Sequence, residues 1–129
     1  MANHNDTIEI VEGLHTFCFD SSEWSHLLKF DGDNNIDYKN LRDSVPGSKA
    51  VDIIGVRNAN ELVFIEVKDY RNNRPGLEDK INTGTLNKEL VQKMRDSIAC
   101  IAASARVSTN NVNLWREYLQ LLRNRDNKV

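Results

Sequence analysis

The sequence predicts an α/β fold, and two observations support this. Residues 51–71, VDIIGVRNANELVFIEVKDYR, contain two strongly apolar runs separated by a polar Asn-Ala-Asn turn, a pattern typical of a β-hairpin. Residues 86–123 then carry apolar side chains at helical spacing in two segments. With 129 residues, 40% of them hydrophobic and 28% charged, the chain is expected to form a single domain over residues 1–129.

The region before this hairpin has weaker signals. Within residues 7–20, TIEIVEG and LHTFCFD alternate enough to predict short strands, although a helix near the start is an alternative. Residues 21–30, SSEWSHLLKF, begin with Ser21 or Ser22 as a candidate helix N-cap, but their apolar residues do not settle the period. Residues 31–50 are rich in Asp, Asn, Gly and Ser, so we expect a long loop there.

The hairpin strands are expected at about 50–57 and 61–69, followed by a polar loop over 71–84. A long amphipathic helix is expected from about Leu86 to Ala105, and a second helix from about Val112 to Arg123. The apolar stripe of the first helix is Leu90, Met94, Ile98, Ile101 and Ala105, and that of the second is Leu114, Trp115, Tyr118, Leu119 and Leu122. The last residues, NRDNKV, look like a turn that leads into another strand.

Composition excludes several classes of protein. No apolar run approaches the roughly 18–20 residues that cross a bilayer, and no secretory signal opens the chain, so we expect no membrane partner. Cys18 and Cys100 are read as reduced thiols of a cytoplasmic protein. The net charge of -2 divides into -7 for residues 1–67 and +5 for residues 68–129. This asymmetry is compatible with binding a polyanion through a metal-dependent site, or simply with two solvated faces of opposite sign.

Three ionisable residues interrupt the apolar hairpin: Asp52, Glu66 and Lys68. If Asn-Ala-Asn is a three-residue loop, Asp52 lies opposite Glu66, and Lys68 lies on the same face of the sheet. A two-residue loop would instead pair Asp52 with Ile65. Two opposed carboxylates repel each other, and a hard divalent cation such as Mg²⁺ or Mn²⁺ resolves the conflict. A neighbouring lysine then suits phosphodiester hydrolysis. The alternative is an ion-pair network on a solvated sheet face.

At these residues the sequence resembles the PD-(D/E)XK nuclease superfamily, which has the restriction-endonuclease-like fold. The segments KAVDIIGV, LVFIEVKDYR and ELVQKMRDSIACI are similar to those of a group of small, uncharacterised bacterial members. Over about residues 20–105 the resemblance implies an α-β-β-β-α-β core: a mixed sheet with a central antiparallel hairpin flanked by helices. No strand fits between Ala105 and Val112, so we expect that the last strand is missing or that the chain is C-terminally truncated. The sheet edge left exposed would then favour a homodimer.

The resemblance also implies roles for individual residues. Asp52, Glu66 and the carbonyl of Val67 would bind Mg²⁺ or Mn²⁺, and Lys68 would be the catalytic lysine. Many members add an acidic residue from the first helix. Glu23 is the best candidate for that metal ligand, with Asp20 and Asp31 behind it; an exposed helix position is the alternative for Glu23.

Nucleic-acid contacts are expected from polar residues near the hairpin. The candidates are Tyr70, Arg71, Arg74 and Lys93, each of which could otherwise be an ordinary surface residue. The sequence thus predicts a Mg²⁺-dependent nuclease that hydrolyses DNA phosphodiester bonds, in DNA maintenance or defence. The alternative is a catalytically inactive module of the same fold that binds nucleic acid or a protein partner.

Overall fold

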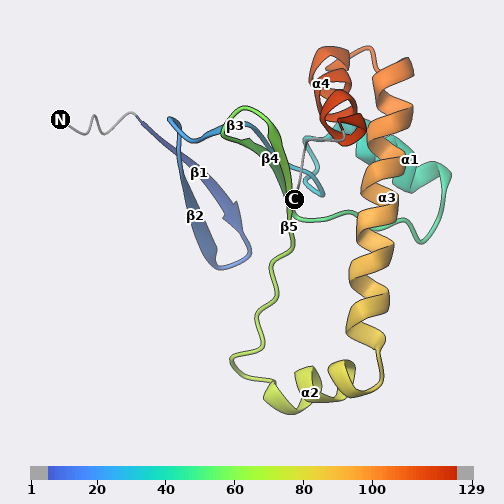
Figure 1. The fold of residues 1–129 in the computed structure, drawn as a ribbon. Coiled ribbons are helices and arrows are strands. Elements are labelled where there is room, and N and C mark those ends of the chain that lie inside the picture. The colour runs from blue at the N-terminus through green and yellow to red at the C-terminus, as the bar shows by residue number, and fades with distance from the viewer. Residues whose placement is uncertain (1–5, 125–129) are drawn as a thin grey trace.

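Two small antiparallel sheets and four helices make up residues 6–124, the part of the chain that our computed structural model describes (Figure 1). In chain order the strands are β1 (Thr7–Glu12), β2 (His15–Asp20), β3 (Trp24–Lys29), β4 (Ile53–Arg57) and β5 (Glu61–Ile65). The helices are α1 (Ile36–Ser44), α2 (Arg74–Asn82), α3 (Thr85–Val107) and α4 (Val112–Arg123). The α/β class expected from the sequence is confirmed.

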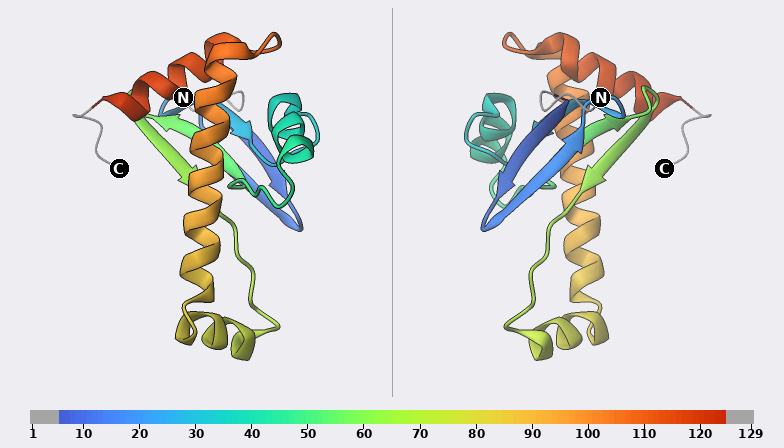
Figure 2. Two further views of the ribbon diagram at one scale, coloured as in Figure 1. Left: turned by 90° about the vertical axis from the view of Figure 1, so that its right-hand side faces the viewer. Right: turned by 90° about the vertical axis from the view of Figure 1, so that its left-hand side faces the viewer.

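The elements form three layers. The β1–β2 hairpin lies on one side of the three-stranded sheet β3-β4-β5, and α3 and α4 lie on the other side (Figures 1 and 2). Alternation along β4 explains why both sides are covered, because Ile54 and Val56 join the core beneath the helices while Ile53 is buried on the opposite face. The centre of the sheet is therefore dry on both faces.

The register of the β4–β5 hairpin is the one that a three-residue loop predicts. Arg57 pairs with Glu61 and Ile53 pairs with Ile65, so Asp52 and Glu66 come next in the same register. The strands are shorter than expected, however. Pairing stops at Ile53 and Ile65, so Asp52, Glu66, Val67 and Lys68 lie just beyond the strand ends.

The structure decides one open reading and overturns two expectations. Residues 24–29, whose period was unsettled, form the bulged strand β3 and not a capped helix, since they pair with β4. The predicted loop over 31–50 contains α1, whose N-terminus is capped by the Asn35 side chain bonded to the Tyr38 N–H. The predicted loop over 71–84 contains α2, which begins with Asn73 as its cap and Pro75 in its first turn.

The two C-terminal helices are confirmed, with one correction to the first of them. Ile101 and Ala105 are buried in the core, as expected. Leu90, Met94 and Ile98 belong to the same predicted stripe but are 38–39% exposed. The reason is visible in Figures 1 and 2, where the first half of α3 extends past the sheet and carries α2 at its end.

The second helix, α4, contributes two aromatic residues to the centre of the core. Trp115 and Tyr118 are buried, and Trp115 packs edge-to-face on Phe30 with the ring centroids 5.6 Å apart. Leu114, Leu119 and Leu122, also in the predicted stripe, pack around this core.

The order of elements departs from the expected core. The first helix, α1, follows three strands and does not precede them, and every strand pair in residues 6–124 is antiparallel, so the described sheets are not mixed. The strand expected near the C-terminus falls mainly on residues 125–129, which lie outside the described residues. None of the described helices combines the length and apolar composition needed to span a membrane.

Candidate metal centre

Asp52 lies in a group of carboxylates and directly precedes Ile53, the first residue of β4. It is only 6% exposed, and the backbone N–H of Val67 donates a hydrogen bond to its Oδ2 over 2.7 Å. The Glu66 carboxylate lies beside it, close enough to share a proton. The two carboxylates that the hairpin pattern predicts to face each other are therefore adjacent.

Two more carboxylates, from distant parts of the chain, complete the group. Asp31 follows β3, and Glu12 ends β1. Oxygens of Glu12, Asp31 and Asp52 lie within 4.8 Å of one another. We refer to Glu12, Asp31, Asp52 and Glu66 as the carboxylate cluster.

The way the β1–β2 hairpin is attached explains how Glu12 reaches the cluster. Glu12 pairs with His15 across the turn of this hairpin, and His15 Nε2 lies 2.9 Å from Asp69 Oδ2, just after the Glu66-Val67-Lys68 segment. On the other side, Lys29 Nζ lies 3.5 Å from Glu12 Oε2. The turn of the β1–β2 hairpin is thus linked to Asp69 through His15 and to Lys29 through Glu12.

The cluster contains unsatisfied oxygen atoms. In residues 6–124, three buried side-chain oxygens accept no hydrogen bond, although Lys29 Nζ lies 3.5 Å from the first of them: Glu12 Oε2, Asp31 Oδ1 and Glu66 Oε2. All three belong to the carboxylate cluster. Leaving a buried acceptor without a donor costs roughly 1–3 kcal/mol. Hard divalent cations take carboxylate oxygens as ligands, so an all-oxygen donor set of this kind fits Mg²⁺ or Mn²⁺.

Crowding of the carboxylates shifts their protonation. Burial raises the pKa of Asp31 to about 7, with further contributions from its hydrogen bond to Asp52 and the charge of Glu12. Burial and the contact with Asp52 likewise raise the pKa of Glu66 to about 7. Burial also opposes ionisation of Asp52, but hydrogen bonds from Glu66, Val67 and Asp31 outweigh it and lower the Asp52 pKa. Asp52 therefore keeps the negative charge, and its neighbours hold the protons.

Two residues of α3 position the cluster. Lys93 Nζ donates a hydrogen bond to Glu66 Oε1 over 2.9 Å, with only 18% of the lysine side chain and 9% of the glutamate side chain exposed. Ser97 is completely buried, and its Oγ accepts a hydrogen bond from the Val51 N–H while donating one to the Lys93 carbonyl. The helix thus holds the residue before Asp52 and the side chain of Glu66.

Lys68 lies beside the cluster but does not bind a carboxylate of it. Its Nζ is 3.5 Å from Glu89 Oε2 on α3. Glu89 also pairs with Lys80 of α2, at 3.1 Å. The structure therefore places the proposed catalytic lysine next to Glu89.

Glu23 does not join the cluster, so the prediction that it supplies the additional acidic ligand is wrong. It lies in the turn before β3, and its carbonyl accepts a hydrogen bond from the Asn58 N–H in the β4–β5 loop. That loop is at the opposite end of β4 from Asp52. Asp20 is in the same turn, where Ser22 bonds to it. Of the three acidic candidates, only Asp31 reaches the cluster.

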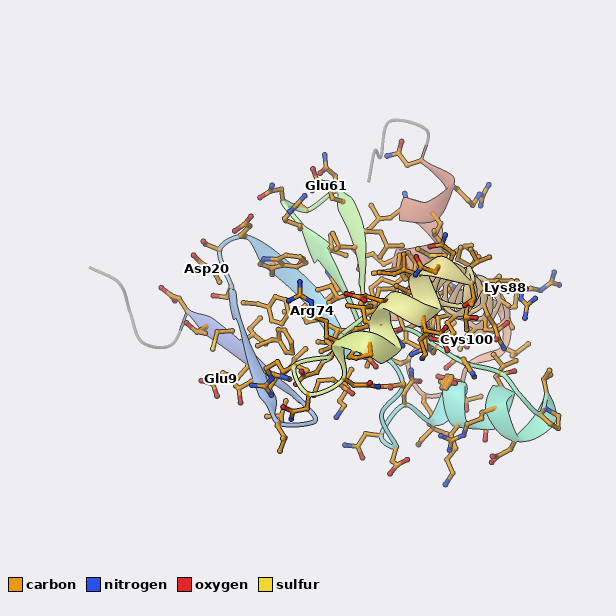
Figure 3. The ribbon with its side chains drawn as sticks, turned by 90° about the horizontal axis from the view of Figure 1, so that it is seen from below. Glu9, Asp20, Glu61, Arg74, Lys88 and Cys100 are labelled. Atoms are coloured by element: carbon orange, nitrogen blue, oxygen red, sulfur yellow. The ribbon has the colours of Figure 1, made fainter. Side chains whose placement is uncertain are left out.

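The residues predicted to contact nucleic acid interact with different neighbours in the structure. Lys80 Nζ lies 5.9 Å from the centre of the Tyr70 ring, and Arg71 donates hydrogen bonds to Asp69. Arg74 lies at the start of α2, where Figure 3 labels it. Its side chain is 87% exposed and pairs loosely with Glu78 at 4.0 Å. Lys93 is already bonded to Glu66. Each of these four residues therefore already has an interaction partner among the described residues.

Sequence reasoning missed Glu12 and underrated Asp31. Glu12 falls on the same face of β1 as the half-buried Ile8 and Ile10, whereas Glu9 falls on the exposed face, so strand alternation was a usable signal for Glu12. Asp31 carried one usable signal, because it follows a short apolar run, as a ligand at a strand end would. A comparison of the chain with protein-family models, curated proteins and solved structures found no match in any of the three.

Proposed function

We propose that the protein is a nuclease that hydrolyses DNA phosphodiester bonds with the help of Mg²⁺ or Mn²⁺. The observation that carries this proposal is the carboxylate cluster, in which oxygens of Glu12, Asp31 and Asp52 lie within 4.8 Å of one another and three buried oxygens accept no hydrogen bond. The resemblance of Asp52 and Glu66-Val67-Lys68 to the PD-(D/E)XK superfamily supports the same function.

The residues in and around the cluster would have different roles in metal binding and positioning. Asp52 and Glu66 would hold the cation together with Asp31 and Glu12, and the Val67 carbonyl is the further ligand that the resemblance implies. The cation would polarise the phosphodiester and offset the negative charge that develops on it during hydrolysis. Lys93 keeps Glu66 in place through its 2.9 Å hydrogen bond.

Lys68 is the residue we assign to the scissile phosphate. It ends the predicted motif, lies 3.5 Å from the Glu89 carboxylate and lines the same cavity as Asp31 of the cluster. An ammonium group there can stabilise charge on a phosphoryl oxygen or orient the attacking water. Since 30% of its side chain is exposed, substrate can reach it.

The proposal extends to the fold of the core, the oligomeric state and the cellular location of the protein. We assign the β3-β4-β5 sheet and α3 to a restriction-endonuclease-like core. β5 is an edge strand among the described residues, so pairing of two β5 strands would form a homodimer. The free thiols Cys18 and Cys100 are consistent with the reducing conditions of the cytoplasm.

Cleavage of labelled single- and double-stranded DNA tests the proposal. We expect cleavage with Mg²⁺ or Mn²⁺, none with EDTA, and a loss of at least about 100-fold in Asp52→Asn, Glu66→Gln and Lys68→Ala. Glu23→Gln and Glu61→Gln are the matched controls, because both carboxylates lie at the far end of β4 and β5; Figure 3 labels Glu61. Cleavage that persists in EDTA or in Asp52→Asn would refute the assignment.

A second candidate is an inactive module that binds nucleic acid or a protein partner. The pairing of Glu66 with Lys93 and of Lys68 with Glu89 favours it, because both charged motif residues already have partners inside the chain. Thermal melting with millimolar Mg²⁺ or Mn²⁺ separates the candidates. A metal-dependent rise in Tm that Asp52→Asn abolishes supports the metal centre, whereas an unchanged Tm favours the inactive module.

A further inference from the structure

A cavity of about 350 Å³ adjoins the carboxylate cluster, and cations dominate its lining. Asp31 belongs to both the cavity and the cluster, and Lys93 contributes to the cavity wall while bonding to Glu66. The volume falls at the lower end of the range of small-ligand pockets, roughly 300–1,000 Å³. The cavity is therefore large enough for one phosphorylated unit and continuous with the proposed metal centre.

The five cations that line the cavity come from five separate parts of the chain. The cations are Arg42 of α1, Lys49 before β4, Lys68 after β5, Lys80 of α2 and Lys93 of α3. Only Asp31 and Glu89 oppose them in the lining. With all groups ionised, five cations face two carboxylates in the lining, so the cavity is cationic.

Arg42 and Lys49 differ from the other three cations of the cavity. Lys68, Lys80 and Lys93 each form an ion pair with a carboxylate of α3 or of the cluster. Among the described residues, neither Arg42 nor Lys49 forms such a pair; the Arg42 guanidinium lies 5.9 Å from the centre of the Tyr38 ring. These two cations keep their full capacity to bind an external anion.

The segment that carries Lys49 is held firmly. Its backbone N–H donates to Asp96 Oδ2 at 3.0 Å, Val51 N–H donates to Ser97, and Gln92 Nε2 donates to the Gly47 carbonyl. Three side chains of α3 thus fix residues 47–51 along the cavity. Lys49 lines the cavity from a segment that these hydrogen bonds hold in place. Because the segment is already ordered, less entropy is lost when an anion binds to it.

We infer that this cavity binds the phosphate group of a nucleotide, with Arg42 and Lys49 as its principal ligands, and so receives the substrate backbone next to the scissile phosphate. The last part of this inference rests on the proposed function, whereas phosphate binding itself does not. Arginine offers paired N–H donors and lysine a point charge, which together suit a phosphate oxygen pair.

Fluorescence anisotropy with a labelled 12-nucleotide single-stranded DNA in EDTA tests the inference without any cleavage. We expect Arg42→Gln and Lys49→Gln each to weaken binding several-fold and to reduce the salt dependence of log Kd by about 0.7 for each phosphate that the variant no longer neutralises. Arg42→Lys should recover part of the affinity. Lys39→Gln and Lys88→Gln are the matched controls; both residues are exposed outside the cavity, and Figure 3 labels Lys88.

Competition with a deoxynucleoside 5′-monophosphate identifies the source of the phosphate. If the monophosphate binds as tightly as the oligonucleotide and depends on Arg42, the cavity takes a free nucleotide. If only the oligonucleotide binds in that way, the cavity takes the polymer backbone. Both outcomes support the inference. Equal affinity of wild type, Arg42→Gln and Lys49→Gln for both ligands, with unchanged Tm, would overturn it.

The result is separable from that of the cleavage assay. Arg42-dependent binding without metal-dependent cleavage would remove the proposed nuclease activity and keep the phosphate site. Cleavage that is unaffected in Arg42→Gln and Lys49→Gln, together with unchanged binding, would remove the phosphate site and keep the nuclease.

Discussion

The backbone N–H of Val67 donates a hydrogen bond to Asp52 Oδ2 over 2.7 Å. This bond joins the two halves of the motif at the point where β4 and β5 stop pairing through their backbones. A side-chain acceptor thus replaces the next main-chain partner, and it fixes the Asp52 carboxylate beside Glu66.

Substitutions of Asp52 should separate this structural role from metal binding. Asp52→Asn retains an oxygen that can accept from Val67, so we expect a small change in the free energy of unfolding. Asp52→Ala leaves a part-buried N–H unpaired and should destabilise the protein by about 1–3 kcal/mol. Urea unfolding in EDTA measures both values, and equal stability of the two variants would contradict this role of the carboxylate.

Stability of the metal-free protein should fall as the pH rises through 7. In the folded protein the pKa of both Asp31 and Glu66 is raised to about 7, whereas the unfolded chain titrates them near pH 4. Between these values the folded state binds more protons, so their contribution is complete below about pH 4 and is lost as the pH passes 7. Melting in EDTA from pH 5 to 8.5 should show the fall.

Neutralising either acid should remove part of that dependence. We expect Asp31→Asn to melt at a higher temperature than wild type at pH 8, since about 1 kcal/mol shifts the Tm of a domain of this size by roughly 4 °C. Glu66→Gln also leaves Lys93 without its 2.9 Å partner, so for this variant only the pH slope is expected to fall. Glu61→Gln, far from the cluster, should keep the wild-type slope. If Asp31→Asn keeps that slope as well, the shifted pKa has been assigned to the wrong group.

Metal binding should become tighter between pH 6 and pH 8. A cation binds ionised carboxylates, so it must displace the protons held by Asp31 and Glu66 near neutrality. Calorimetric titration with Mn²⁺ in buffers of different ionisation enthalpy counts the protons released at pH 7. Asp31→Asn should release fewer protons than wild type. A proton count of zero in wild type would argue against these ligands.

Ser97 should be a positioning residue of the metal centre. Its Oγ accepts from the Val51 N–H at 3.0 Å inside the protein, so Ser97→Ala leaves a buried donor unpaired. We expect a loss of about 1–3 kcal/mol in the free energy of unfolding and weaker Mn²⁺ binding, measured at a temperature where the variant is folded. Ser104→Ala is the matched control, because Ser104 is also buried in α3 but contacts Cys100. Identical Mn²⁺ affinity of wild type and Ser97→Ala would exclude the positioning role.

The local features of the fold were largely predictable. The strands β1 and β2, the Asn-Ala-Asn loop and both C-terminal helices follow from alternation, turn composition and helical spacing. α1 and α2 were missed because their mean composition is polar. Caps by Asn35 and Asn73 form them in segments that read as loops. In such short helices, capping and docking outweigh the weak apolar pattern.

The candidate site was likewise predictable from the sequence only in part. The sequence by itself determined a hairpin whose register depends on the length of its loop, with Asp52 opposite Glu66 for a three-residue loop and opposite Ile65 for a two-residue loop. The structure forms the three-residue loop, so Asp52 and Glu66 are the next residues in the observed register. Only the tertiary structure decided that Glu12 and Asp31 join them and that Glu23 does not. These choices depend on how the β1–β2 hairpin and the turn after β3 dock against the sheet. Contacts between residues so far apart in the chain leave no periodic trace in a single sequence.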